Sequence, residues 1–336
     1  MDEKEKNQLA LMIQKDFPMC SRPYLELARE FCSTEEEILE VLGEWKEDHR
    51  LREISAVMEG EFLGYDSALV CGKIPQTELE KTAAIISDHP SVTHNYERLH
   101  EYNLWFTIGV PSGMSLESHL EVLSRLTGHG PFYALRKKRT YKIGVAFNFA
   151  SGQNESEGKR HFSDKIPVLD EKEIKIIRCL QKDLPLCSLP FERLCEENDV
   201  NVDDLFLFAK RHMGGAVRKY VATFRHRNMG VSANGMTVWN IDSDKMEEKA
   251  QIFASSSVVS HCYERSAFDG FPYNLYAMMH APDREKLFSM VDEMSISADC
   301  NDYIILQSSR EFKKTRLRYF LPELTEWWEK YGRLAA

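Results

Sequence analysis

The chain has 336 residues, of which 43% are hydrophobic and 29% charged, values ordinary for a globular protein of two to four domains. No apolar run is long enough to span a membrane, and the segment MDEKEKNQLA lacks the features of a secretion signal, so neither insertion nor secretion is expected. A net charge of −10 disfavours broad nucleic-acid affinity, and eight cysteines without a Cys-x-x-Cys pair predict free thiols in a reducing cytoplasm.

The sequence contains two versions of one unit. QKDFPMCS at 14–21 matches QKDLPLCS at 181–188, which lies 167 positions later. Arg52 likewise corresponds to Arg218, at an offset of 166. Between the units, residues 150–168 are polar and rich in Ser, Gly and charge, which predicts a linker.

The first part of each unit has a helical pattern. Residues 3–16 carry an apolar stripe, Pro23 is suited to the first turn of a helix through Phe31, and Ser33-Thr34 predicts the cap of a third helix. A strand follows at 51–58. Three helices and a strand resemble a winged helix-turn-helix, and the second unit repeats them from Asp170 to Phe224.

The second part of each unit alternates strands and helices. In the first unit the pattern predicts a strand at 67–74, a helix at 78–87, a hairpin of 91–100 with 102–110, a helix at 116–126 and a strand at 132–143. The second unit gives 235–240, 246–254, 258–265 with 273–280, 283–294 and 303–313. This order is the ferredoxin-like βαββαβ arrangement. The tail should form a helix that docks through Trp327, Trp328 and Tyr331.

The predicted fold class is α+β, a tandem repeat of winged helix-turn-helix and ferredoxin-like domains, which is the plan that the Lrp/AsnC regulators share. The expected divisions are a helix-turn-helix domain at 1–60, an AsnC-type domain at 61–149, the linker at 150–168, the second pair of domains at 169–226 and 227–320, and a final helix at 321–336.

The hairpins carry the most informative residues. His94, Tyr96 and Arg98 correspond to His261, Tyr263 and Arg265, 167 positions later, and alternation along a strand places each trio on one face. Beyond a break, Tyr102-Asn103-Leu104 corresponds to Tyr273-Asn274-Leu275, 171 positions later, so the second turn should be longer. Imidazole, phenol and guanidinium on one face predict a lining for a flat, anionic ligand.

The patterns THNYERLHEYNLWFT and SHCYERS…FPYNLYAMMH resemble the two subunit types of the sirohaem (siroheme) decarboxylase family, here fused in one chain. The resemblance covers nearly all of residues 1–320. It implies loss of CO2 from the acetate side chains on rings C and D of siroheme, giving 12,18-didecarboxysiroheme in haem or d1-type haem biosynthesis. No cofactor beyond the iron tetrapyrrole substrate is implied.

The residue types support this chemistry. Arginine pairs with carboxylates in a bidentate fashion, and decarboxylation leaves a carbon that must be protonated, for which His or Tyr is suited. The predicted catalytic residues are His94, His100, His261, Tyr96 and Tyr263. The predicted substrate-binding residues are Arg98, Arg265, Arg136, Lys138, Arg139, Asn103, Tyr273, Asn274, Arg310, Lys313 and Lys314. The asparagines are alternatively turn-fixing residues, and the basic segments 136–142 and 310–318 are alternatively solvated edges.

His100 has no counterpart in the second unit and is the first choice for a specialised role, as proton donor or iron ligand. We expect only one of the two faces to be a competent site. The halves should pack as a pseudo-heterodimer, with further dimerisation left open.

Two alternatives remain, a Lrp/AsnC-type transcription regulator and a tetrapyrrole sensor without chemistry. The first predicted recognition helix, TEEEILEVLGEWKED, is strongly acidic and would be repelled by phosphates, so DNA is a disfavoured partner. A sensor would share the pocket and lack the proton donor.

Overall fold

The two helix-turn-helix regions have the predicted elements. The structure is a computed structural model that describes residues 1–147, 154–156, 168–224 and 233–335. The first region comprises α1 (Glu3–Lys15), α2 (Pro23–Glu30), α3 (Glu35–Glu47) and β1 (Leu51–Met58). The second comprises α6 (Glu171–Leu180), α7 (Pro190–Glu196), α8 (Val202–His212) and β7 (Val217–Phe224).

Local capping explains where these helices begin. Asp2 and Asp170 each form a capping box with the glutamate three residues later, at the starts of α1 and α6. Thr34 caps α3 by accepting a hydrogen bond from the backbone of Glu37. The duplicated sequence signals therefore produce duplicated helix starts.

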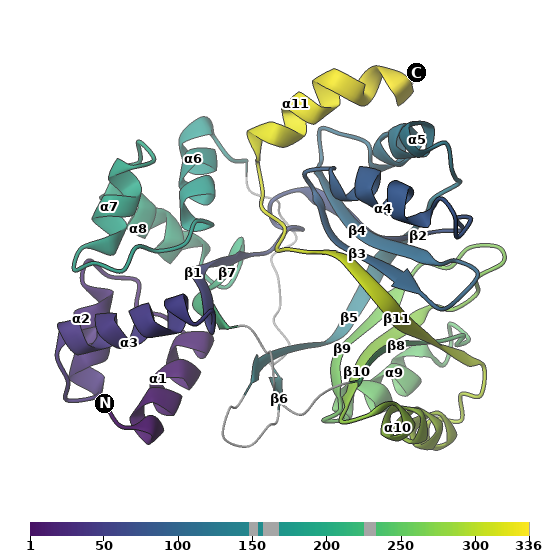
Figure 1. Cartoon of the computed structure of the whole chain (residues 1–336), viewed down its shortest axis with the longest axis horizontal. Helices are drawn as coiled ribbons and strands as arrows, with labels where there is room; N and C mark the ends of the chain where they lie inside the picture. Colours follow the sequence, from purple (N-terminus) through teal and green to yellow (C-terminus); the bar gives the residue numbers. More distant parts are fainter. Residues whose placement is uncertain (148–153, 157–167, 225–232, 336) are drawn as a thin grey trace.

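The strands β1 and β7 do not form separate wings but pair with each other. They make an antiparallel two-stranded sheet, called here the wing sheet, between the helices of the two regions (Figure 1). One continuous hydrophobic core joins both regions across this sheet, with Tyr24, Trp45 and Tyr220 among its large buried side chains. The two helix-turn-helix regions therefore form a single body.

The remaining elements form two ferredoxin-like units. The first contains β2 (Tyr65–Gly72), α4 (Leu79–Ser87), β3 (Val92–Arg98), β4 (Leu104–Pro111), α5 (Leu116–Thr127) and β5 (Tyr133–Phe147). The second contains β8 (Ala233–Trp239), α9 (Met246–Ser255), β9 (Val259–Arg265), β10 (Leu275–Ala281), α10 (Arg284–Ser297) and β11 (Tyr303–Lys314). The predicted βαββαβ order is thus present twice.

The two units close into one barrel. The strand order is β2-β4-β3-β11-β8-β10-β9-β5, and β5 also pairs with β2, which completes the ring, while β6 (Asn154–Ser156) attaches to β5. The last strand of each unit pairs with the second strand of the other, β11 with β3 and β5 with β9. β5 extends beyond its predicted end at residue 143 because its last residues pair with β6. Each junction strand, β3 and β9, carries one of the His-Tyr-Arg trios.

Separate cores lie on the two faces of the ring. The helices α4 and α5 cover the outer face of the first unit, and α9 and α10 cover that of the second (Figure 1). The inner face has its own core from both units, which includes Trp105, Phe271, Tyr276 and Leu306. The interior is therefore a pseudo-heterodimer interface, as expected for fused halves.

The chain ends with α11 (Pro322–Tyr331) and a 3-10 turn, Gly332–Ala335. As predicted, this helix docks through its tryptophans, since Trp327 is buried against the rings of His89 and His119. The second hairpin turn is longer than the first, with Phe268 bridging to Phe271 and Gly270 at a φ of +89°. Most of the predicted linker lies outside the described residues. Across the described part of the chain, no helix is long and apolar enough to cross a membrane.

Candidate active site

Each His-Tyr-Arg trio points into the barrel, as strand alternation predicts. On β3, the intervening residues Asn95 and Glu97 face the helices, since Asn95 Nδ2 donates to Ala83 O at 2.9 Å and Glu97 Oε1 accepts from Gln76 Nε2 at 2.9 Å. Arg98, on the inner face, is 6% exposed. The two trios therefore face the same interior from opposite sides of the ring.

The two arginines lie deepest. Arg98 Nη1 donates to Leu306 O at 2.7 Å, and Arg265 Nη1 donates to Leu135 O at 3.1 Å, each bond crossing to the other unit. Each guanidinium also stacks on the tyrosine of its own trio, 5.4 Å from the Tyr96 ring and 5.2 Å from the Tyr263 ring. Burial lowers the pKa of Arg98 to about 10, a value at which the group is still charged at neutral pH.

The middle of the barrel is filled, so the predicted linings for a flat, anionic ligand do not enclose a shared hollow at this level. Trp105, Phe271, Tyr276 and Leu306 occupy this level. An eight-stranded ring has an interior just wide enough for its own side chains, or for one small ligand. The interior at this level therefore has room for its own side chains and leaves the ends of the barrel as the open parts of the ring.

His94 and His261 lie toward the barrel end that faces the wing sheet. Ladder irregularities at Thr93 and Ser260 aim their hydroxyls at the adjacent histidine. Thr93 Oγ1 is 3.0 Å from His94 Nδ1, and Ser260 Oγ is 2.9 Å from His261 Nδ1. Nε2 of each ring has no hydrogen-bond partner among the described residues. Each imidazole is thus held at one nitrogen and available at the other.

Burial and nearby cations keep both imidazoles neutral. Burial, assisted by the charges of Lys314 and Arg52, lowers the pKa of His94 to about 4. Burial, assisted by His280, Arg218 and Lys142, lowers the pKa of His261 to about 4. Both imidazoles are therefore neutral at pH 7.

Arg52 and Arg218, which the sequence analysis did not select, lie close enough for their charges to lower the pKa of His94 and His261. They come from β1 and β7, so the wing sheet supplies one cation to each half of the site. Lys142 is a third addition, and its Nζ donates to Ser256 O at 2.6 Å. The correspondence of Arg52 with Arg218 in the internal repeat was the available signal, although their approach to the hairpins depends on the β1–β7 pairing.

His100 is separated from His94. Strand β3 rises by roughly 3.3 Å per residue, so Arg98 lies about 13 Å beyond His94, and His100 follows in the hairpin turn. There it lies beside Tyr102 and Phe271, with ring centroids 5.9 and 5.7 Å away, and the Tyr102 amide donates to its Nδ1 at 3.1 Å. One reacting carbon cannot contact both His94 and His100.

The tyrosines of the trios are weak proton donors in this setting. Burial raises the pKa of Tyr263 to about 12. Burial and the carboxylate of Glu311, which accepts from Tyr96 Oη at 3.3 Å, also raise the pKa of Tyr96. Both phenols are therefore better placed to hold ligand oxygens than to supply protons.

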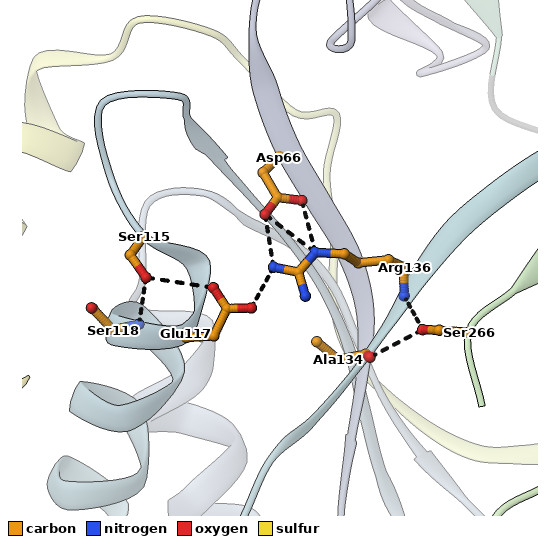
Figure 2. Close-up of polar contacts among 7 residues, drawn as sticks. All are labelled: Asp66, Ser115, Glu117, Ser118, Ala134, Arg136 and Ser266. Carbon is orange, nitrogen blue, oxygen red and sulfur yellow. Dashed lines mark hydrogen bonds and ion pairs between the residues drawn. The ribbon is translucent and has the colours of Figure 1, made fainter. Parts of the chain in front are cut away.

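Arg136 already has carboxylate partners within the chain. Figure 2 shows its guanidinium between Asp66 and Glu117, with Nη2 2.8 Å from Asp66 Oδ2 and 2.5 Å from Glu117 Oε1. Its backbone amide donates to Ser266 Oγ at 2.9 Å, which ties β5 to the second hairpin. The geometry assigns Arg136 a structural part, because ligand binding would require one of these ion pairs to open.

The other cations of the basic segments divide between the two faces. Arg310 pairs with Glu97 at 2.6 Å, and Lys313 Nζ donates to Ser87 O on the helix-covered face. Lys138 and Arg139 lie near Glu264, at 3.9 and 3.8 Å. Lys314, in contrast, pairs in register with His94. Among the basic residues predicted to bind substrate, Lys314 is therefore the one that lies beside His94.

The asparagines fix loops, the alternative considered from the sequence. Asn103 bonds both backbone groups of Ile74, and Asn274 bonds both backbone groups of Ile241, at 2.7–3.0 Å. Their amides are therefore occupied in both units. Tyr273 packs on Phe271, and burial and Asp302 raise its pKa.

The fold defines a class, a duplicated AsnC-like protein whose two ferredoxin-like units close into one barrel. A family model described as an AsnC-like ligand binding domain matches residues 62–142 and 228–313. A second model, the siroheme decarboxylase NirDL-like HTH domain, matches residues 7–52.

The relatives specify the family. A siroheme decarboxylase of Hydrogenobacter thermophilus is 34% identical over 97% of this chain and 98% of its own length. A siroheme decarboxylase beta subunit of Methanosarcina barkeri is 31% identical over 45% of this chain and 99% of its own length. The crystal structure of siroheme decarboxylase NirDL in complex with an iron-uroporphyrin III analogue has a TM-score of 0.80 and 29% identity, covering 99% of this chain and all of that one. The chain belongs to the siroheme decarboxylase family and is a carboxy-lyase.

Proposed function

We propose that the chain removes CO2 from the acetate side chains on rings C and D of siroheme, giving 12,18-didecarboxysiroheme in haem or d1-type haem biosynthesis. The proposal requires no cofactor beyond the iron tetrapyrrole that is the substrate. The eight free cysteines fit a reducing cytoplasm as its location. Self-association of the fused chain is a further expectation.

The observation that carries the proposal is the pairing of an available imidazole with cations in each half of the barrel end. His94 has Lys314 and Arg52 near it, and His261 has Lys142 and Arg218. Cations compensate the cost of removing several carboxylates from water. Because the imidazole is neutral, it neither repels these cations nor neutralises them, and their positive charge stays available to the carboxylates of the ligand.

The ligand itself completes the acid–base site. A carboxylate beside His94 or His261 favours the imidazolium and raises the histidine pKa toward neutrality. In the reaction the bond between the methylene and carboxyl carbons breaks, CO2 leaves, and the electron pair on the methylene carbon takes up a proton. A histidine Nε2 without a competing partner is suited to deliver this proton.

Only one half is expected to be fully competent, and the halves do differ. The second half has His280 beside His261, whereas the corresponding residue of the first half is Gly109. The first half has His100, but near the far end of its strand. These differences favour the second half as the competent one.

The test is anaerobic incubation of the purified chain with siroheme, followed by mass spectrometry and visible spectroscopy. Enzymatic decarboxylation lowers the tetrapyrrole mass by two CO2 and changes the spectrum. A spectral change with unchanged mass would show a sensor. No change in either measurement would refute tetrapyrrole binding as well.

A further inference from the structure

A serine hydroxyl joins two imidazoles in the second half of the site. Ser260 Oγ lies 2.9 Å from His261 Nδ1 and 2.7 Å from His280 Nε2. Ser260 is buried, and the irregularity in the β9–β10 ladder at this residue lets its side chain reach both rings. His280, on β10, is only partly buried.

The first half lacks this arrangement. There, His94 Nδ1 contacts Thr93 Oγ1 at 3.0 Å and Thr107 Oγ1 at 3.3 Å, and the two threonine hydroxyls lie 2.6 Å apart. Thr107 occupies the position of Met278, and Gly109 that of His280. A hydroxyl can pass a proton but cannot hold an extra one near neutral pH. The row of hydrogen-bonded groups in the first half, His94, Thr93 and Thr107, therefore has no second group that can hold a proton in reserve.

We propose that His280 supplies protons to His261 through Ser260, and that this relay makes the second half the decarboxylating one. The inference rests on the proposed function, because each carboxylate lost as CO2 is replaced by one proton on carbon. His280 acts through His261 and does not touch the substrate.

The transfer balances without a further reactant. His261 gives its Nε2 proton to the methylene carbon while its Nδ1 takes the hydroxyl proton of Ser260. Ser260 in turn takes the Nε2 proton of a protonated His280, which becomes neutral. Water then reprotonates His280, whose ring is partly exposed. The net change is one proton moved from solvent to carbon, with the remaining proton of neutral His261 now on Nδ1 in place of Nε2. This proton returns to Nε2 by exchange with solvent before the next transfer.

The electrostatics of His261 explain why a separate store is needed. Arg218 from β7 and Lys142 from β5 lie near its ring, and burial adds to their effect in keeping its pKa low. Glu59 opposes these cations near Tyr263. His261 is thus suited to exchange one proton for another without carrying a lasting positive charge.

The test compares His280→Gln with His280→Ala in the full chain. Glutamine keeps a hydrogen-bonding amide at Ser260 but cannot deliver a proton, and alanine leaves space for added imidazole. We expect the single-turnover decarboxylation rate of both variants to fall about 100-fold or more, with siroheme affinity within threefold of the parent. Imidazole should restore part of the rate in the alanine variant.

Two controls separate the relay from other effects. His129→Gln removes a histidine outside the site and should leave rate and affinity unchanged. Thr107→Val removes a hydroxyl from the hydrogen-bonded groups around His94 in the first half and should lower the decarboxylation rate less than tenfold. A rate within twofold of the parent in His280→Gln would overturn the relay, as would equal losses of affinity and rate. If the parent chain itself leaves the siroheme mass unchanged, the proposed function fails and not merely the relay.

Discussion

Lowering the pH from 7 to 5 should destabilise this protein markedly, because several histidines are buried in neutral form. Burial lowers the pKa of His94, His119 and His261 from 6.5 to about 4. Between these values the unfolded chain binds more protons than the folded one. Stability is therefore complete above the unfolded pKa and is lost as the pH falls toward the folded pKa.

The expected loss can be worked out for each group. A histidine whose pKa shifts in this way costs about 2 kcal/mol at pH 5, so three independent groups cost about 6 kcal/mol as an upper bound. His89 adds to this in the same direction, since burial and His119 lower its pKa as well. Domains of ordinary stability have about 5–15 kcal/mol in total. The upper bound is therefore comparable to the whole stability of a domain at the lower end of this range.

The assay is urea unfolding at pH 7, 6 and 5, followed by circular dichroism and tryptophan fluorescence. We expect the free energy of unfolding to fall by at least about 2 kcal/mol between pH 7 and 5. Metal-free uroporphyrin should reduce the fall by its contacts with His94 or His261. A free energy that is constant over this range would refute the assignment of neutral, buried histidines.

Three substitutions test other parts of the structure. Arg218→Gln should weaken uroporphyrin binding by roughly 10- to 100-fold in an absorbance titration, as expected for a lost charged hydrogen bond. Arg52→Gln should have a smaller effect, because the second half is the one proposed to be competent. Equal affinity of the parent and Arg218→Gln for uroporphyrin would contradict this. Arg316→Met should lower the free energy of unfolding by about 2–4 kcal/mol. The reason is that Arg316 donates to Ser55 and Thr223 of the wing sheet and pairs with buried Glu53. A loss under about 1 kcal/mol would show that these contacts are dispensable. Trp327→Ala should raise amide hydrogen exchange in α11 and around His119, and unchanged exchange would show that the helix is held by other contacts.

Much of the fold follows from local signals in the sequence. Asp2, Thr34 and Asp170 predict helix starts through their caps, and alternation along β3 predicts that His94, Tyr96 and Arg98 share a face. These signals involve residues close in sequence, and duplication repeats them. The fold class and both βαββαβ units were therefore predictable.

The closure of the barrel was not predictable in this way. Pairing of β11 with β3 and of β5 with β9 depends on contacts between units, which leave no local periodicity. This pairing between units also fills the interior. The pairing of β1 with β7, equally long-range, brings Arg52 and Arg218 near the histidines. Arg136 shows the same limit, since its partners Asp66 and Glu117 come from β2 and α5.

The most direct measurement of the central claim follows the histidine nitrogens by NMR while metal-free uroporphyrin is added. If the ligand binds at the barrel end beneath the wing sheet, Nε2 of His261 or His94 should shift, and the pKa of that ring should rise from about 4. Perturbation of His100 with both of these rings unchanged would place the ligand at the opposite end and contradict the account.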